Sequence, residues 1–253
     1  MQKFVYGLIT NSFTVSFMIF ELKKFLVVVA VIITALPCIS GLKGPSQNTK
    51  PDASIIPLRK NSSVEMVYDS LHLDQKGLSR VAFDYAISGY KELKSKGILH
   101  NDSVLTIIDF DQPSYNKRMY IIDIKNYKLL FNTLTAHGRN TGLETAKYFS
   151  NSPESFKSSL GLYITDQTYN GKNGYSLKLK GLEKINNNAM NRAIVLHGAP
   201  YVSQRMINSR GYIGRSHGCP AVPQELNIPI IEKIKGGSCF FIYNNSYHSD
   251  NTI

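Results

Sequence analysis

The chain has 253 residues, of which 43% are hydrophobic and 19% are charged, and its formal net charge is +11. This balance suits one globular core and excludes a largely disordered chain, and the sequence contains neither internal repeats nor a glycine-rich phosphate loop. The basic residues are scattered and match no nucleic-acid-binding motif, so the composition disfavours nucleic acid as a partner. We expect a basic domain of this kind to be attracted to anionic surfaces, such as membrane lipid or a cell-wall polymer.

The first 40 residues are typical of an export signal. An apolar stretch, residues 25–35, follows Lys23 and Lys24, and small residues precede a cleavage position after Ser40. A second apolar stretch lies ahead of it, and we therefore expect translation to start at Met18. The alternative is an uncleaved anchor that tethers the domain through residues 25–40, because the apolar stretch is near the lower limit of about 17 residues for a span. In either case we predict an exported protein of the periplasm or cell envelope.

The sequence then divides into a linker, a folded domain and a tail. Residues 41–61 are rich in Gly, Pro, Ser, Asn and Lys and predict a flexible linker. The domain should occupy residues 62–243, beginning with a capping box at Ser62–Glu65 that opens a short amphipathic helix. Apolar residues at helical spacing predict a second helix over residues 78–93, with Gly97 at its C-terminal cap. The polar residues 244–253 predict a disordered tail.

From residue 103 onward the pattern is typical of strands, because β-branched and aromatic residues alternate with turn signals such as Asn170-Gly171 and Asn173-Gly174. A short helix is expected over Pro229–Lys235. We therefore predict a mainly β domain with flanking helices, built as an antiparallel sandwich or open barrel. The predicted strands are Val104–Phe110, Met119–Ile124, Lys128–Ala136, Leu160–Thr165, Tyr175–Leu179, Ala193–Leu196 and Ser238–Tyr243.

Two cysteines lie within the predicted domain, Cys219 and Cys239. A disulfide between them is open to an exported protein. Cys239 lies in a segment that reads as a buried strand, where a cysteine is more often an inert apolar residue. We therefore expect two free thiols with different roles.

The segment Ser216-His217-Gly218-Cys219 combines a hydroxyl, an imidazole, a glycine and a thiol, which are the parts of a cysteine acyl-transfer site. A thiol has a reference pKa of about 8.5, so it needs a neighbouring base to supply thiolate at neutral pH. The backbone N–H groups of Gly218 and Cys219 are the expected donors to an oxyanion.

Two histidines are candidates for the general base. His197 follows a predicted buried strand, where a side chain is held firmly, and His217 lies two residues before the thiol. Sequence spacing alone does not decide between them. Gly198 or a nearby carbonyl is expected to orient the ring of His197.

A zinc site formed by His197, His217 and Cys219 is an alternative, because tetrahedral zinc takes nitrogen and sulfur ligands. His137 is the best candidate for its fourth ligand. The glycine-rich setting favours access by a substrate over a closed metal site.

His197-Gly198, followed by Gly214-Arg215 and the Ser-His-Gly-Cys segment, resembles the signature of the murein L,D-transpeptidase catalytic domains of the YkuD-like group. That signature is a histidine followed, after a variable gap, by Ser/Thr-His-Gly-Cys. The resemblance covers roughly residues 70–243. It includes Ser158–Tyr163, Tyr169–Lys172 and Arg192–Ala199.

The resemblance implies an exported transferase in which Cys219 attacks the third residue of a peptidoglycan tetrapeptide stem and expels D-alanine. The acyl group would pass to an amine on murein or on a lipoprotein. By the same resemblance, His197 is the base, and Ser216, His217 and Gly218 shape the loop of the thiol. Neither a metal nor an organic cofactor is implied.

The expected substrate-binding residues are Arg215, Gly198 and Tyr163, with Arg205 and Arg192 as further candidates for binding a stem carboxylate. The residues after the thiol, Pro220-Ala221-Val222-Pro223, depart from the family pattern, and this leaves substrate recognition open. Two other functions stay open as well. One is an L,D-carboxypeptidase or crosslink hydrolase that uses water as the acceptor, and the other is a non-catalytic module that binds the cell wall.

Overall fold

The computed structural model describes residues 66–248. The predicted signal peptide or anchor, the linker, the capping box and residues 249–253 lie outside this range. Within it, no helix is long and apolar enough to cross a membrane. In chain order the elements are α2 Met66–Ser70, α3 Arg80–Ser95, β1 Val104–Asp109, β2 Met119–Asp123, β3 Lys128–Thr133, β4 Gly161–Gly171, β5 Gly174–Gly181, β6 Val195–Ala199, α4 Gln204–Arg210, β7 Ala221–Pro223, a 3-10 turn Gln224–Leu226, α5 Asn227–Ile234 and β8 Cys239–Tyr243.

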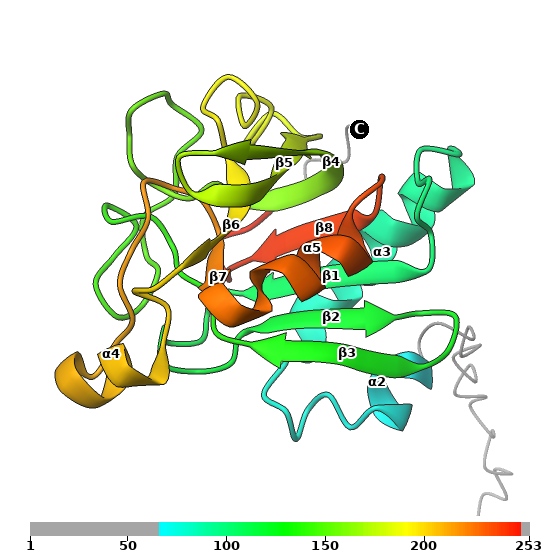
Figure 1. Ribbon diagram of the computed structural model, residues 1–253. Coiled ribbons are helices and arrows are strands. Elements are labelled where there is room, and N and C mark those ends of the chain that lie inside the picture. Colours follow the sequence, from blue (N-terminus) through cyan, green and yellow to red (C-terminus); the bar gives the residue numbers. More distant parts are fainter. Residues whose placement is uncertain (1–65, 249–253) are drawn as a thin grey trace, which may run out of the picture. The chain divides into compact units, whose positions relative to one another are not determined.

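The eight strands form one sheet in the order β3-β2-β1-β8-β4-β5-β6-β7 (Figure 1). The two ends of this sheet approach each other, because Ala136, just after β3, forms an antiparallel bridge to Ala221 in β7. The backbone N–H of Ala136 donates to the carbonyl of Ala221 at 2.8 Å. The sheet is therefore a nearly closed barrel, which brings the segment after β3 beside the strand that follows Cys219.

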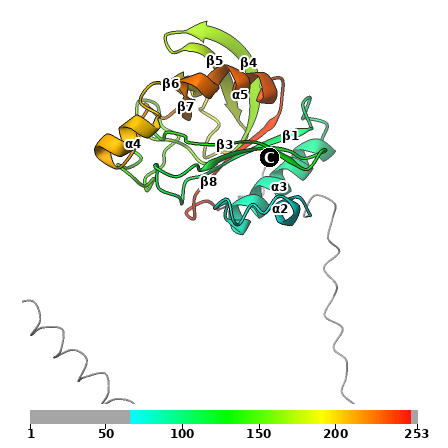
Figure 2. The same ribbon diagram turned by 60° about the horizontal axis from the view of Figure 1, so that its bottom comes forward.

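Helices cover both faces of the sheet, with α5 on one side and α2 and α3 on the other (Figure 2). Helix α3 begins at an N-cap, where the hydroxyl of Ser79 accepts a hydrogen bond from the Ala82 N–H. Its apolar face packs on β1 and β8, whereas α5 contacts β1, β5 and β6. The wholly buried side chains of Phe83 and Leu93 fix α3 to the core. Burial of each such side chain contributes about 1.5–3 kcal/mol.

The prediction of a mainly β domain with flanking helices is confirmed, and each of the seven predicted strands corresponds to an observed one. The Asn-Gly turn signals join β4 to β5, where Gly171 pairs with Gly174. Not all neighbours are antiparallel, because β1 pairs with β8, and β6 with β7, in parallel. Strand β7 follows β6 through a crossover that contains α4, and such a connection returns the chain in the same direction. Both α4 and β7 are absent from the predicted elements.

The predicted disordered tail is wrong for residues 244–248. Tyr247 is buried, its hydroxyl donates to the Glu183 carboxylate at 2.7 Å, and its ring lies edge-on to Phe241 and Tyr85. The side-chain amide of Asn244 also donates to Asp111 at 2.8 Å. The polar composition of this segment concealed one aromatic anchor that ties it to the core.

A wholly buried arginine, Arg118, directly precedes β2 and contacts the segment after β3, which lies beside the Cys219 loop. Arg118 donates to the carbonyls of Thr135 at 2.8 Å and Gln112 at 2.9 Å and to Nδ1 of His137 at 2.8 Å. Burial lowers the pKa of the Arg118 guanidinium to about 9, so the group stays cationic at neutral pH. The carbonyl of His137 in turn accepts a hydrogen bond from the Ser216 N–H at 2.9 Å. Arg118 therefore supports the position of the Cys219 loop indirectly, through His137.

We expect Arg118→Met to destabilise the domain by at least about 3 kcal/mol, because several buried acceptors would lose a charged donor and each orphaned group costs about 1–3 kcal/mol. Urea unfolding followed by circular dichroism measures this loss. The neighbouring exposed Lys117→Met is the control and should change the unfolding free energy by no more than about 0.5 kcal/mol. Equal stability of the two variants would show that the network contributes little.

Candidate active site

The parallel pairing of β6 with β7 brings His197 and Cys219 to the same region of the sheet. His197 lies opposite Ala221, and Gly198 lies opposite Val222. Cys219 precedes Ala221 by two residues and therefore lies beside the start of β6. The side chains of paired residues on neighbouring strands face the same side of the sheet. The pairing therefore places His197 on the strand next to the segment that carries the thiol.

The thiol of Cys219 lies against the backbone at the start of β6. Its sulfur is 3.7 Å from the carbonyl oxygen of Ala193, to which the S–H donates. Burial of the sulfur raises the pKa of the thiol, while the Val195 N–H and the Arg192 guanidinium act in the opposite direction. The resting residue is therefore a protonated thiol, and reaction with an acyl group requires a base to remove its proton.

His197 has the protonation state that such a base requires. Its ring is buried in β6, and Nδ1 lies 3.0 Å from the carbonyl oxygen of Gly198. The Gly198 carbonyl accepts a hydrogen bond from the Nδ1–H, and this tautomer leaves the Nε2 lone pair as the basic site. Burial lowers the pKa of His197 below its usual value near 6.5, so the imidazole is neutral at neutral pH. In the described residues, the thiol hydrogen bond runs to Ala193 and not to either histidine.

His217 occupies a different environment. It is exposed, and its ring lies edge-on to Phe156 with the ring centroids 4.8 Å apart. The guanidinium of Arg139 lies over the same ring, 4.0 Å from the Phe156 centroid. The packing of His217 against Phe156 favours His197 over His217 as the base.

Ser216 and Gly218 hold the loop in shape. The Ser216 hydroxyl donates to the Cys219 carbonyl at 2.6 Å and accepts from the Gly218 N–H at 3.0 Å. Gly218 has a φ of +122°, and a Cβ there would lie 2.8 Å from the Lys157 carbonyl oxygen. Only glycine fits this position without strain. Because the Gly218 N–H is bonded to Ser216, its predicted role as an oxyanion donor is wrong; the same role for the Cys219 N–H stays a prediction.

Arg192 holds the segment of residues 150–159 in place. Its guanidinium donates to the Ser150 carbonyl at 2.8 Å, to the Ser159 hydroxyl at 3.2 Å and to the Lys157 carbonyl. These bonds occupy both terminal nitrogens. Arg192 therefore acts mainly as a support, whose charge also favours the thiolate form of Cys219.

The three residues predicted to bind substrate have different positions. Tyr163 is wholly buried, and its hydroxyl is bonded to Ser159 at 2.7 Å, so the predicted direct contact with substrate is wrong. Gly198 is also buried, and a Cβ there would lie 2.9 Å from Cβ of Asn227. The carbonyl of Gly198 orients His197, and the residue's lack of a side chain allows the first residue of α5, Asn227, to pack closely. Nη1 of Arg215 donates to the carbonyls of Arg139 at 3.0 Å and Gly142 at 3.1 Å. A substrate contact through its other nitrogens stays a prediction.

His137, the candidate fourth ligand of the alternative zinc site, has no free ring nitrogen to bind a metal. Nδ1 accepts from Arg118, and Nε2 lies 3.1 Å from the Gly142 carbonyl oxygen, so both ring nitrogens are engaged. Burial and the Arg118 charge lower the pKa of His137 to about 3. Over residues 66–248, no three His, Cys, Asp or Glu side chains are grouped as a metal site would require.

Sequence reasoning missed three residues of the site region: Arg139, Phe156, and Asn227, which lies against Gly198. A third His-Gly pair, His137-Gly138, was the available signal for Arg139, which directly follows it. Phe156 and Asn227 gave no local signal, since their roles depend on contacts between distant segments. Ser158 lies within the segment that carries the family resemblance, and its hydroxyl donates to the Gly218 carbonyl at 3.2 Å.

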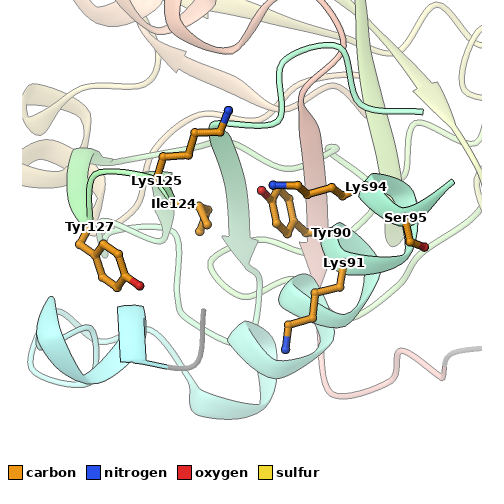
Figure 3. Close-up of a pocket in the computed structure, with 7 residues that line it drawn as sticks. All are labelled: Tyr90, Lys91, Lys94, Ser95, Ile124, Lys125 and Tyr127. Atoms are coloured by element: carbon orange, nitrogen blue, oxygen red, sulfur yellow. The ribbon is translucent and has the colours of Figure 1, made fainter. Parts of the chain in front are cut away.

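A separate basic pocket of about 540 Å³ lies beside α3 and the turn after β2 (Figure 3). Its lining includes Lys91, Lys94 and Lys125, and the last two form ion pairs with Asp102 at 3.1 and 2.6 Å. It shares no residue with the Cys219 region and contains no nucleophile comparable to the thiol. We therefore place the candidate chemistry at Cys219.

The model of the L,D-transpeptidase catalytic domain family matches residues 74–243. A search of curated proteins finds no significant match. Similar solved structures include an L,D-transpeptidase from Mycobacterium smegmatis, with 12% identity, coverage of 56% of this chain and 59% of that chain, and a TM-score of 0.36.

Two further solved structures give similar values. Bd1075 of Bdellovibrio bacteriovorus shares 13% identity, with coverage of 61% and 54% of the two chains and a TM-score of 0.38. An L,D-transpeptidase from Stackebrandtia nassauensis shares 15% identity, with coverage of 55% of each chain and a TM-score of 0.33. These matches span less than two thirds of each solved chain, and their TM-scores are below 0.5, so no function is inferred from them. The family match spans most of the chain and includes both His197 and Cys219, and it shows that this chain belongs to the L,D-transpeptidase catalytic domain family.

Proposed function

We propose that the protein is a peptidoglycan L,D-transpeptidase in which Cys219 is the nucleophile and His197 the general base. The observation that carries this proposal is the parallel pairing of the buried His197 with Ala221, which follows Cys219 by two residues, so that the imidazole lies on the strand next to the thiol. Cys239, the other cysteine of the described residues, is free but wholly buried in β8 and has no access to a substrate. Cys219 is only partly buried, so its thiol is the more accessible of the two.

The proposed reaction has two half-reactions. Nε2 of His197 takes the thiol proton while the sulfur attacks the carbonyl carbon of the third stem residue. The peptide bond to D-alanine breaks, its nitrogen receives the proton from His197, and a thioester remains on Cys219. An amine then attacks the thioester, the new amide forms, and the sulfur leaves as thiolate and regains a proton. General acid–base help of this kind contributes roughly 10²–10⁴-fold to the rate.

We also propose that this chemistry takes place outside the cytoplasm. The support is the sequence of residues 1–40, with its basic start, apolar stretch and small residues before Ser40. An exported location suits a substrate that forms part of the cell wall. Fractionation of cells that express the full chain, with detection of residues 66–248, tests this part separately.

Mass spectrometry of the full chain incubated with a tetrapeptide-stem muropeptide tests the chemistry. We expect a covalent adduct on Cys219, equal in mass to the stem without its terminal residue, together with release of one D-alanine. Adding an amine acceptor should convert the adduct into a crosslinked product. Release of only the free tripeptide would instead identify a hydrolase. A folded protein that forms no adduct and releases no D-alanine would contradict the proposed function.

A further inference from the structure

Arg139 lies at the edge of the Cys219 loop, and its backbone is tied to that loop. Its N–H donates to the Ser216 carbonyl at 2.8 Å, and its carbonyl accepts from Arg215 at 3.0 Å. The preceding Gly138 approaches so closely that a Cβ there would lie 3.0 Å from Cα of Gly218. The residue is therefore placed by the same contacts that shape the loop of the thiol.

The side chain of Arg139 is exposed and held in one direction by an aromatic ring. Its guanidinium lies 4.0 Å from the centroid of Phe156, and the same ring contacts His217. The backbone of Phe156 is fixed as well, since its carbonyl accepts from the Asn140 N–H at 3.1 Å. A guanidinium stacked on a fixed ring keeps its N–H edge available for a planar anion.

Arg139 differs from the other two arginines of the region in how its donors are used. Arg192 and Arg215 donate to backbone carbonyls. Among residues 66–248, no hydrogen bond or ion pair engages the guanidinium of Arg139. An exposed cation with five free donors beside a nucleophile fits a carboxylate through two parallel hydrogen bonds.

We infer that Arg139 binds a carboxylate of the stem peptide while the peptide lies at Cys219. The inference rests on the proposed function and adds to it a residue that determines substrate specificity. His217 links the two positions, because it contacts the Phe156 ring and precedes Cys219 by two residues, which span at most about 7 Å even when fully extended. The carboxylate is either that of the terminal D-alanine or another on the same stem, and the test separates these sources.

The test combines a protein variant with a substrate variant. With the free-acid tetrapeptide, Arg139→Ala should raise KM by about 10- to 100-fold and change kcat little, because a charged hydrogen bond made equally in the ground and transition states is lost. Arg139→Lys should recover part of this loss. The matched control is Arg210→Ala, another exposed arginine, located on α4, and it should match the wild type.

Amidation of the substrate identifies the carboxylate. If Arg139 binds the terminal carboxylate, the C-terminally amidated peptide should raise the wild-type KM by the same factor, and Arg139→Ala should cause no further loss. If only amidation of an internal carboxylate removes the difference, that group is the one bound. An Arg139→Ala effect that persists with both amidated peptides would overturn the inference.

A binding measurement separates failure of the inference from failure of the proposed reaction. Calorimetry on Cys219→Ala, with and without Arg139→Ala, measures peptide affinity when no acyl transfer takes place. We expect the double variant to bind about 10- to 100-fold more weakly, whether or not the wild type forms an adduct. Equal affinities of the two proteins would overturn the role of Arg139 even if the Cys219 adduct is found.

Discussion

Replacing Cys219 with alanine is expected to abolish formation of the covalent stem adduct and to reduce turnover by roughly 10⁴-fold or more. The reason is that the sulfur forms the bond that carries the acyl group, and no other accessible thiol lies in the described residues. The domain should stay folded, since the thiol makes one long contact with Ala193 and contributes little to stability. Adduct mass and D-alanine release, measured on the same sample, check this prediction.

The matched control is Cys239→Ala, which removes the buried thiol of β8. Burial raises the pKa of Cys239, so this sulfur stays protonated and unreactive, and its loss should leave adduct formation intact. The variant should be slightly less stable because it leaves a small cavity. If adduct formation followed Cys239 and survived the loss of Cys219, the assignment of the nucleophile would be wrong.

Replacing His197 with alanine should slow acylation by about 10²–10⁴-fold, the contribution of a lost general base. In the wild type, burial lowers the pKa of His197, and the base works only when neutral. The acylation rate should therefore fall as the pH drops through an apparent pKa below 6.5 and stay level at neutral pH. In His197→Ala this fall of the rate at acidic pH (the acidic limb of the pH profile) should disappear, along with most of the acylation rate.

His217→Ala is the comparison for this prediction, because His217 is exposed and packs on Phe156. It should retain both the acidic limb and most of the acylation rate; the opposite pattern would assign the base to His217. Circular dichroism at each pH is needed as a control. The buried His137 has a pKa of about 3, so the unfolded chain takes up a proton that the folded chain refuses, and stability declines as the pH falls below about 6.5.

Much of the strand content was available from the sequence, because alternating apolar residues and Asn-Gly turns are local signals. Strand β7 was not, since its three residues, Ala221–Pro223, are too few to show a period. The tail was misjudged for a related reason: composition averages over a segment and hides one residue, Tyr247, that packs in the core. Both errors concern segments whose structure is decided by partners far away in the chain.

By itself, the sequence determined which reactive groups this protein carries. The sequence places a thiol, a hydroxyl and two imidazoles at Ser216–Cys219 and His197. These groups limit which reactions the site can perform. Only the tertiary structure decided the division of roles among the side chains around the thiol. It buried Tyr163, tied Arg215 to carbonyls and left Arg139 with free donors, because burial and hydrogen bonding depend on which distant segments the barrel brings together.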